Sequence, residues 1–196
     1  MKLTIFTVLL ICMSFINQTN HEEWLVKADS SLYIHGKTNI NAFTCGIPGF
    51  NKTNYLSYNS AGKEKVSFQQ SCEIVINVDG FKCENSMMTR DLLKTLNANS
   101  HPTMNIKFKT ISLPLSTVCS GQIISSRAAI DLAGKTSIYS IDLKVSDVDQ
   151  NNLTLKGSRQ ICFSDFDLVP PSKMGGLVKV NDFIEVNFTF NLSRMN

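Results

Sequence analysis

Hydrophobic and polar residues alternate along most of this 196-residue chain. The cleanest example is FIEVNFTFNL, residues 183–192, where apolar side chains occupy every second position and polar ones lie between them. A period of two is typical of a β-strand with one buried and one exposed face. We therefore expect this segment to be a strand of an antiparallel sheet.

The same pattern recurs at regular intervals. It predicts one or two strands in 24–45, a hairpin in 55–68 with its turn at 59–62, a strand in 72–81, and further strands in 103–113, 121–134, 136–148 and 151–163. Glycine and proline interrupt it in 46–54, which predicts a loop. About eight strands joined by short turns indicate a mainly β protein, an antiparallel sandwich or barrel. An eight-stranded barrel has room inside for side chains or one small ligand.

One segment breaks the alternation. In CENSMMTRDLLKTLNA, residues 83–98, Met88, Leu92 and Leu96 are spaced four residues apart, as on one face of a helix. Ser86 or Thr89 is the expected N-cap, and Asp91 is expected in the first turn. The asparagines and the His-Pro pair in 97–102 predict its end.

The first twenty residues read as a signal peptide. Lys2 precedes an uncharged, mostly apolar run that ends near Ile16, which is too short to span a bilayer. Ile11 before Cys12 does not suit the small residue that lipoprotein signals require, so we expect export without lipidation. The cleavage position stays open, and 21–196 is expected to form a single domain.

Six cysteines are present, and removal of Cys12 with the signal leaves five. In an oxidising compartment these would pair, with at least one left over. Our first choice is a bond between Cys45 and Cys83, which would tether the base of the helix. Other pairings, and buried free thiols, stay open. No C-x-x-C motif or histidine at ligand spacing suggests a metal site.

Charge and motifs favour no enzyme and no nucleic-acid partner. The net charge is +3 and the basic residues are scattered. No G-x-S-x-G motif occurs, and the three histidines are expected in solvated positions, His21 in a mobile terminus. The aspartate pairs 165/167 and 147/149 fall in turn-like segments. Four N-x-S/T matches, at Asn51, Asn152, Asn187 and Asn191, are treated as chance.

Three pieces in a fixed order carry a family resemblance. They are GKTNINAFTC, then VDGFKCENSMMTRDLLKTLNANSHPTMNIKF, then FSDFDLVPPSKMGGLVKVNDFIEVNFTFNL. Together they resemble the YceI-like family of exported, lipocalin-like bacterial proteins. The cysteines in FTC and FKCEN resemble a Bacteroidetes-type form of that family.

The resemblance implies an antiparallel eight-stranded lipocalin-like β-barrel with the amphipathic helix near its mouth. It also implies a ligand: an isoprenoid or other amphiphilic lipid held inside. From the residues alone, apolar stripes are more often core than cavity wall, whereas the resemblance favours a cavity. The Met pair at the start of the helix would adapt to an irregular apolar ligand, or simply pack the helix on the barrel. The candidate ligand-binding residues are Phe43, Ile76, Met87, Met88, Leu92, Leu96, Met104, Ile106, Phe108, Ile141, Leu143, Phe163, Ile184, Val186 and Phe188.

These observations favour a periplasmic or secreted binding protein, without catalysis or cofactor, whose partner is a hydrophobic small molecule. We expect no stable membrane insertion, and a monomer or homodimer. The alternative is a secreted structural or stress-response barrel that is filled by its own side chains and acts through its surface.

Overall fold

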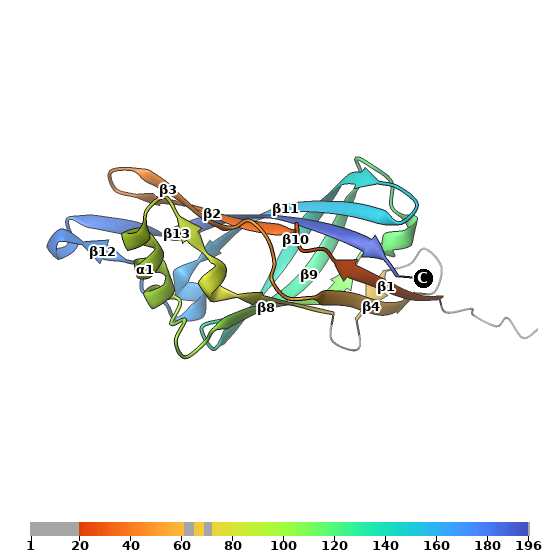
Figure 1. The fold of residues 1–196 in the computed structure, drawn as a ribbon, viewed down its shortest axis with the longest axis horizontal. Helices are drawn as coiled ribbons and strands as arrows, with labels where there is room; N and C mark the ends of the chain where they lie inside the picture. The colour runs from red at the N-terminus through yellow and green to blue at the C-terminus, as the bar shows by residue number, and fades with distance from the viewer. Residues whose placement is uncertain (1–19, 61–64, 69–71, 196) are drawn as a thin grey trace, which may run out of the picture.

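The computed structural model describes residues 20–60, 65–68 and 72–195. These residues form thirteen strands, one α-helix and four short 3-10 helices, arranged as an elongated barrel (Figure 1). All strand pairs are antiparallel. The strands are β1 (Asn20–Val26), β2 (Ser31–Thr38), β3 (Ala42–Ile47), β4 (Asn54–Ser60), β5 (Val66–Ser67), β6 (Glu73–Asn77), β7 (Lys82–Cys83), β8 (Thr103–Ile111), β9 (Ile123–Leu132), β10 (Lys135–Val148), β11 (Asn152–Cys162), β12 (Ser172–Lys173) and β13 (Val178–Arg194).

The strand count differs from the predicted eight because long strands are interrupted. β1 and β2 both pair with β13, at its two ends, and a turn at 27–30 separates them. β3 and β4 pair with β2 and β1 across a second break at 48–53. β5 and β6 both lie along β8. The breaks bend the wall, while each pair of pieces keeps the same neighbouring strands.

The predicted closure of the barrel is also not confirmed, because the described backbone ladders do not form a ring. Within the described segments, no ladder joins β4 to β6. There the buried Asn54 side chain takes the place of a strand: its Oδ1 accepts from the Val75 N–H at 2.8 Å, and its Nδ2 donates to the Val75 carbonyl at 3.3 Å. The Cys72 thiol donates to the Ser57 carbonyl nearby, at 3.1 Å. Side chains therefore bridge the seam that backbone pairing leaves open.

The predicted hairpin in 55–68 is wrong for the described residues. β4 pairs with β1 over its whole length and β5 pairs with β8. Residues 61 and 62 of the predicted turn lie outside the described residues. The alternation predicts that both segments are strands, but it does not predict their neighbours, because strand pairing is decided by contacts with residues far away in the sequence.

The predicted alternation of β13 is confirmed. The polar residues between 184 and 192 lie on the outer face. The inward residues of this stretch are all buried: Ile184, Val186, Phe188, Phe190 and Leu192. In β8 the same holds for Met104, Ile106 and Phe108. The fold class, mainly antiparallel β with one helix at an end of the barrel, agrees with the sequence prediction.

Helix α1 (Ser86–Thr95) lies at the end of the barrel where β7, β12 and the β2–β3 turn also lie (Figure 1). Its N-cap is Asn85, whose Oδ1 accepts from the Met88 N–H at 2.8 Å. The predicted caps, Ser86 and Thr89, are therefore wrong by at least one position, and Asp91 lies beyond the first turn. Leu92 and Leu96 face the core as predicted.

At the opposite end of the barrel, the carboxylate of Glu22 is 2% exposed. It accepts five hydrogen bonds, all from neutral groups: from Trp24 Nε1, Tyr58 Oη, Ser60 Oγ, and the backbone N–H and Oγ of Ser116, at 2.7–3.2 Å. Burial acts to raise the pKa of Glu22, but the hydrogen bonds from Ser116, Tyr58, Trp24 and Ser60 outweigh it and hold the pKa below 4.5. This network connects β1, β4 and the segment that follows β8.

We predict that Glu22→Gln lowers the free energy of unfolding by about 2–3 kcal/mol, because the amide NH₂ would face donors and leave some unpaired. Since the pKa is lower in the folded state, the contribution of Glu22 is complete above pH 4.5 and is lost as the pH falls through the folded-state value. Urea unfolding at several pH values checks this. Glu185→Gln, at an exposed carboxylate, is the control. Equal acid sensitivity of wild type and Glu22→Gln would contradict it.

Candidate functional site

The barrel interior contains a narrow cavity of about 60 Å³. Apolar side chains from α1, β2, β8, β9, β10, β11 and β13 form nearly all of its wall. Ten of the predicted ligand-binding residues line it: Leu92, Leu96, Met104, Ile106, Phe108, Ile141, Phe163, Ile184, Val186 and Phe188. An apolar, buried space of this kind excludes charged ligands and favours hydrocarbon.

A second, wider pocket of about 220 Å³ lies at the end of the barrel beside α1. Its wall combines α1, the β2–β3 turn and the β12–β13 hairpin. Ile34, Leu92 and Phe163 line both this pocket and the interior cavity. The two spaces are therefore adjacent, with these three side chains as the partition between them, and we call the wider pocket the mouth.

The mouth accounts for three more predicted residues, Phe43, Met87 and Met88. Ile76 and Leu143 line neither space. Both are almost fully buried, in parts of the interior that neighbouring side chains fill. For these two residues the structure favours the core interpretation that the sequence left open.

Sequence reasoning missed the rest of the lining. In the cavity these are Leu32, Ile34, Phe81, Ile130, Leu132, Arg159, Ile161, Cys162, Phe166, Leu168 and Phe190. At the mouth they are Thr38, Ile40, Asn41, Cys45, Asn85, Asp91, Pro171, Lys173, Val178 and Val180. Alternation in β2, β11 and β13 could have found several of the apolar ones. No local signal marks the polar residues of the mouth, because three distant segments assemble it.

Arg159 is the one basic residue among the described residues that line the interior cavity. The β10–β11 ladder runs only as far as the Leu143–Gly157 pair, and beyond it the two strands separate. Arg159 lies past that point, exposed, with its guanidinium 5.6 Å from the centre of the Tyr139 ring. The Tyr139 hydroxyl donates to Asp165 at 2.6 Å, which joins β10 to the 3-10 turn Phe163–Phe166 after β11. The cation–π pair of Arg159 and Tyr139 thus lies where β10 and β11 separate.

Two glycines let aromatic rings lie against the wall. A Cβ at Gly157 would come within 2.2 Å of Phe188, and one at Gly36 equally close to Phe43. Each glycine is the cross-strand partner of its ring. Without these glycines the rings would have to move off the strand surface. Phe188 would then move into the cavity, and Phe43 into the mouth.

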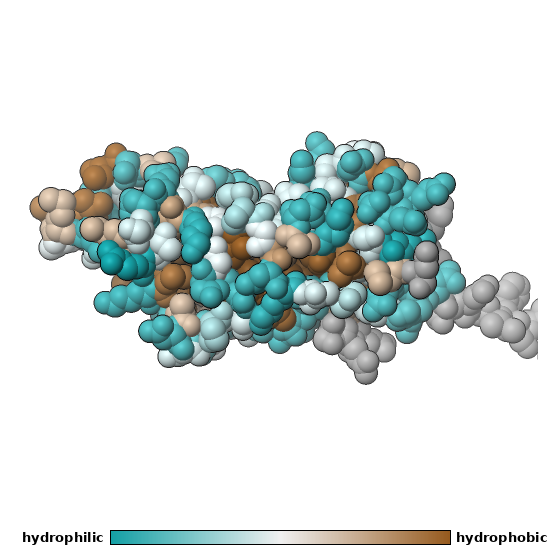
Figure 2. Space-filling model, viewed as in Figure 1, coloured by the Kyte–Doolittle hydropathy of each residue, from teal (hydrophilic) through white to brown (hydrophobic). Residues whose placement is uncertain are grey.

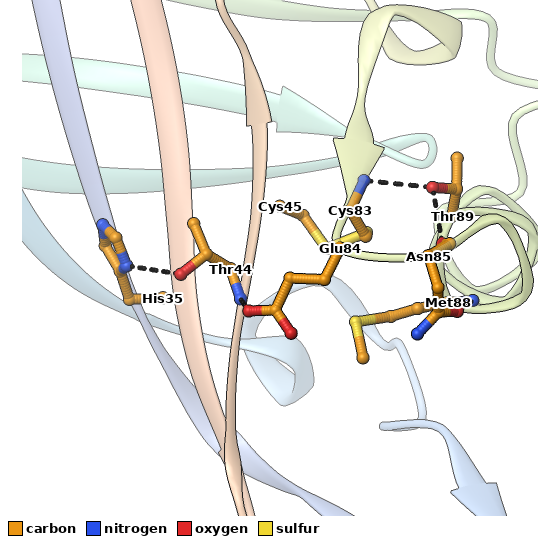
Figure 3. The surroundings of a disulfide bond; sticks show 8 residues. All are labelled: His35, Thr44, Cys45, Cys83, Glu84, Asn85, Met88 and Thr89. Atoms are coloured by element: carbon orange, nitrogen blue, oxygen red, sulfur yellow. Dashed lines mark hydrogen bonds between the residues drawn. A yellow bond between two sulfur atoms is a disulfide. The ribbon is translucent and has the colours of Figure 1, made fainter.

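The predicted Cys45–Cys83 disulfide is present and joins β3 to β7 directly before α1 (Figure 3). Neighbouring hydrogen bonds reinforce it: the Cys83 N–H donates to Thr89 Oγ1 at 3.0 Å, and the Thr44 N–H donates to Glu84 Oε1 at 3.1 Å. The helix base is therefore tied to the barrel wall, as expected. Among the described cysteines, Cys72, Cys119 and Cys162 are free thiols, and Cys12 lies outside the described residues.

We predict that Cys45→Ser/Cys83→Ser lowers the free energy of unfolding by about 2–4 kcal/mol, because the bond closes a 38-residue separation. Hydrogen exchange of α1 should accelerate more than that of β9–β11. Cys119→Ser, at an exposed free cysteine, is the control and should change neither. Unchanged α1 exchange in the double variant would show that the hydrogen bonds alone hold the helix.

Among the described residues, no three His, Cys, Asp or Glu side chains lie together so that they could hold a metal ion. His21 is exposed, as expected, but it lies in β1 rather than in a mobile terminus, and its Nδ1 is 3.1 Å from Asn59 Oδ1. Asp149 accepts from the Asn151 and Asn152 N–H groups, and Asp165 from Tyr139, so these carboxylates serve turns and packing. Within the described segments, no helix has the length and hydrophobicity needed to cross a membrane.

No protein-family model matches the sequence, and no curated protein matches it. Solved structures do share the fold. A polyisoprenoid-binding domain from Saccharophagus degradans, implicated in plant cell wall breakdown, is 13% identical with a TM-score of 0.62, covering 87% of this chain and 97% of that domain. BcnA from Burkholderia cenocepacia is 17% identical with a TM-score of 0.63, covering 85% and 98%. A YceI protein from Campylobacter jejuni is 15% identical with a TM-score of 0.52, covering 65% and 74%. The chain has the fold of these proteins.

Proposed function

We propose that this chain is an exported YceI-like protein that holds the hydrocarbon chain of an amphipathic lipid, with an isoprenoid as the leading ligand, and performs no catalysis. The observation that carries the proposal is the apolar cavity joined to a wider mouth beside α1. The fold that the chain shares with a polyisoprenoid-binding domain supports the choice of ligand class.

Burial of the chain would supply the affinity. Each CH₂ removed from water contributes about 0.8 kcal/mol. The ligand's head would stay at the mouth, where Asn41, Asn85 and the Lys173–Asp91 pair offer polar contacts. Export agrees with the apolar N-terminal run in the sequence and with the Cys45–Cys83 disulfide, which is typical of oxidising compartments.

The cavity is too small to hold a long lipid chain without movement of the side chains that line it. At about 60 Å³ it is much smaller than the ~150 Å³ of an engineered apolar cavity that holds benzene. A long chain therefore has to displace lining side chains. The partition at Leu92 and Phe163 must open first, and flexible methionines such as Met88 and Met104 can then take new rotamers at low cost.

The same observation favours a second candidate function. If the side chains of the wall do not move, the barrel is filled by its own core and acts through its surface. Native mass spectrometry and lipid extraction of the purified protein separate the two. A co-purifying apolar chain, or uptake of a C20 isoprenoid alcohol, supports the binding protein. A protein that contains no lipid and takes up none would exclude the binding protein in favour of the filled barrel.

A bulky residue at the partition tests the route of entry. We predict that Leu92→Phe reduces uptake of the isoprenoid alcohol about tenfold or more, because it narrows the passage between mouth and cavity. Leu143→Phe is the matched control: it overpacks a buried site that lines neither space. Both variants should lose about 1–3 kcal/mol of stability. Equal uptake by the two variants would contradict entry past Leu92.

A further inference from the structure

Four large apolar side chains surround the mouth and point into solvent. They form what we call the apolar rim: Ile40 (69% exposed), Met87 (58%), Met174 (73%) and Leu177 (72%). Ile40 and Met87 line the mouth itself, and Met174 and Leu177 lie at the tip of the β12–β13 hairpin. Figure 2 shows apolar atoms gathered at this end of the molecule, where the β2–β3 turn and β12 lie. Exposed apolar clusters of this kind mark interaction sites.

Hydrogen bonds hold together the two tips that carry most of the apolar rim. Asn39, in the β2–β3 turn, makes three hydrogen bonds to the β12–β13 hairpin: its N–H donates to the Lys179 carbonyl at 3.1 Å, its Nδ2 to the Leu177 carbonyl at 2.9 Å, and its Oδ1 accepts from the Lys179 N–H at 3.0 Å. The two tips are therefore fixed side by side. Their apolar side chains cannot simply fold back onto the barrel without breaking these bonds.

The hairpin tip adopts a costly conformation that exposes these side chains. Met174, Gly175 and Gly176 all have positive φ, at 53°, 64° and 93°. This is easy for glycine and unfavourable for methionine. A Cβ on Gly175 would meet no atom within 4 Å, so the tip projects away from the rest of the protein. The conformation places Met174 and Leu177 at its outermost end.

The charged residues of the two tips are all of one sign. Residues 37–41 and 172–179, the two tips, contain three lysines and no carboxylate. Among the described carboxylates, the one that lines the mouth, Asp91, is paired with Lys173 at 2.8 Å. Lys37 and Lys179 are exposed and have no described ion-pair partner. Apolar tips flanked by lysines match the interface of an anionic bilayer, where side chains enter the acyl boundary and lysines attract the headgroups.

We propose that the apolar rim docks the barrel mouth reversibly on an anionic lipid surface. The mouth would then face the bilayer, so that a lipid chain could pass between the membrane and the barrel without crossing water. This last step rests on the proposed lipid-binding function, whereas docking itself does not. Docking of this kind is peripheral and needs no membrane-spanning segment.

Vesicle flotation tests the proposal. We expect the purified protein to float with vesicles of phosphatidylcholine and phosphatidylglycerol, and more weakly with phosphatidylcholine alone. Ile40→Ser/Leu177→Ser should lower the bound-to-free ratio about tenfold. Lys37→Gln/Lys179→Gln should lower it about tenfold or more on anionic vesicles and leave it unchanged on neutral ones. Added salt should weaken anionic binding alone.

Ile123→Ser is the matched control. Ile123 is 64% exposed but lies at the start of β9, far along the wall from both tips. It should bind vesicles like wild type. Thermal unfolding of all variants checks that the fold is intact, as expected for exposed positions. Equal vesicle binding by wild type and Ile40→Ser/Leu177→Ser, or no binding by wild type, would overturn docking.

Two further outcomes are separable. If wild type is a dimer that Ile40→Ser/Leu177→Ser converts to monomer, and neither binds vesicles, the rim covers a second copy and the proposal fails. If wild type docks on vesicles but carries and takes up no lipid chain, the proposed function fails while docking stands. If wild type neither binds vesicles nor takes up a lipid chain, both the docking proposal and the proposed function are rejected.

Discussion

The hydrogen bonding of β13 organises the rest of the molecule. This seventeen-residue strand pairs with β1, β2, β11 and β12, so it holds together segments from both ends of the chain. Its inward face contributes Ile184, Val186 and Phe188 to the cavity wall. Because a shift of one residue would exchange its two faces, the register of β13 decides which side chains the cavity contains.

The two ends of the barrel differ in which groups are buried and which are exposed. At one end Glu22 is buried with a full set of neutral donors, and this arrangement fixes Trp24, Tyr58 and Ser116 in place. A buried carboxylate is tolerated only when its hydrogen bonds are satisfied, so this end is closed and specific. The other end exposes apolar tips and contains the wider pocket. A disulfide ties the helix at this end to the barrel wall. Under the proposed function, this difference makes the end beside α1 the entrance.

Between the two ends, side chains fill most of the interior and leave one small apolar cavity among the described residues. Phe188 lies flat over Gly157 and Phe43 over Gly36, which keeps two large rings out of the central space. Aromatic contacts such as Phe188–Phe190 fill much of what remains. The result is a cavity that is apolar but narrow, so a bound chain would exchange contacts between side chains for contacts with the ligand. Such an exchange costs little when the replaced contacts are of the same apolar kind.

Much of this was determined by the sequence alone. The period of two located nearly every long strand, and the spacing of four located α1. Ten of the fifteen candidate residues line the interior cavity, Leu92 and Leu96 from the helix face and the other eight from segments with strand alternation. The Cys45–Cys83 bond was the first choice among several possible pairings, because the two cysteines lie at the end of a strand and at the approach to the helix, and it is present. Other features depend on contacts between distant segments, which no local pattern records. These include the breaks that divide the strands, the Asn54 bridge, the burial of Glu22, the position of Arg159 at the separated strands, and the tie between two hairpin tips at the mouth. A local period decides which face of a strand is apolar, whereas only tertiary packing decides what that face meets and how much space remains.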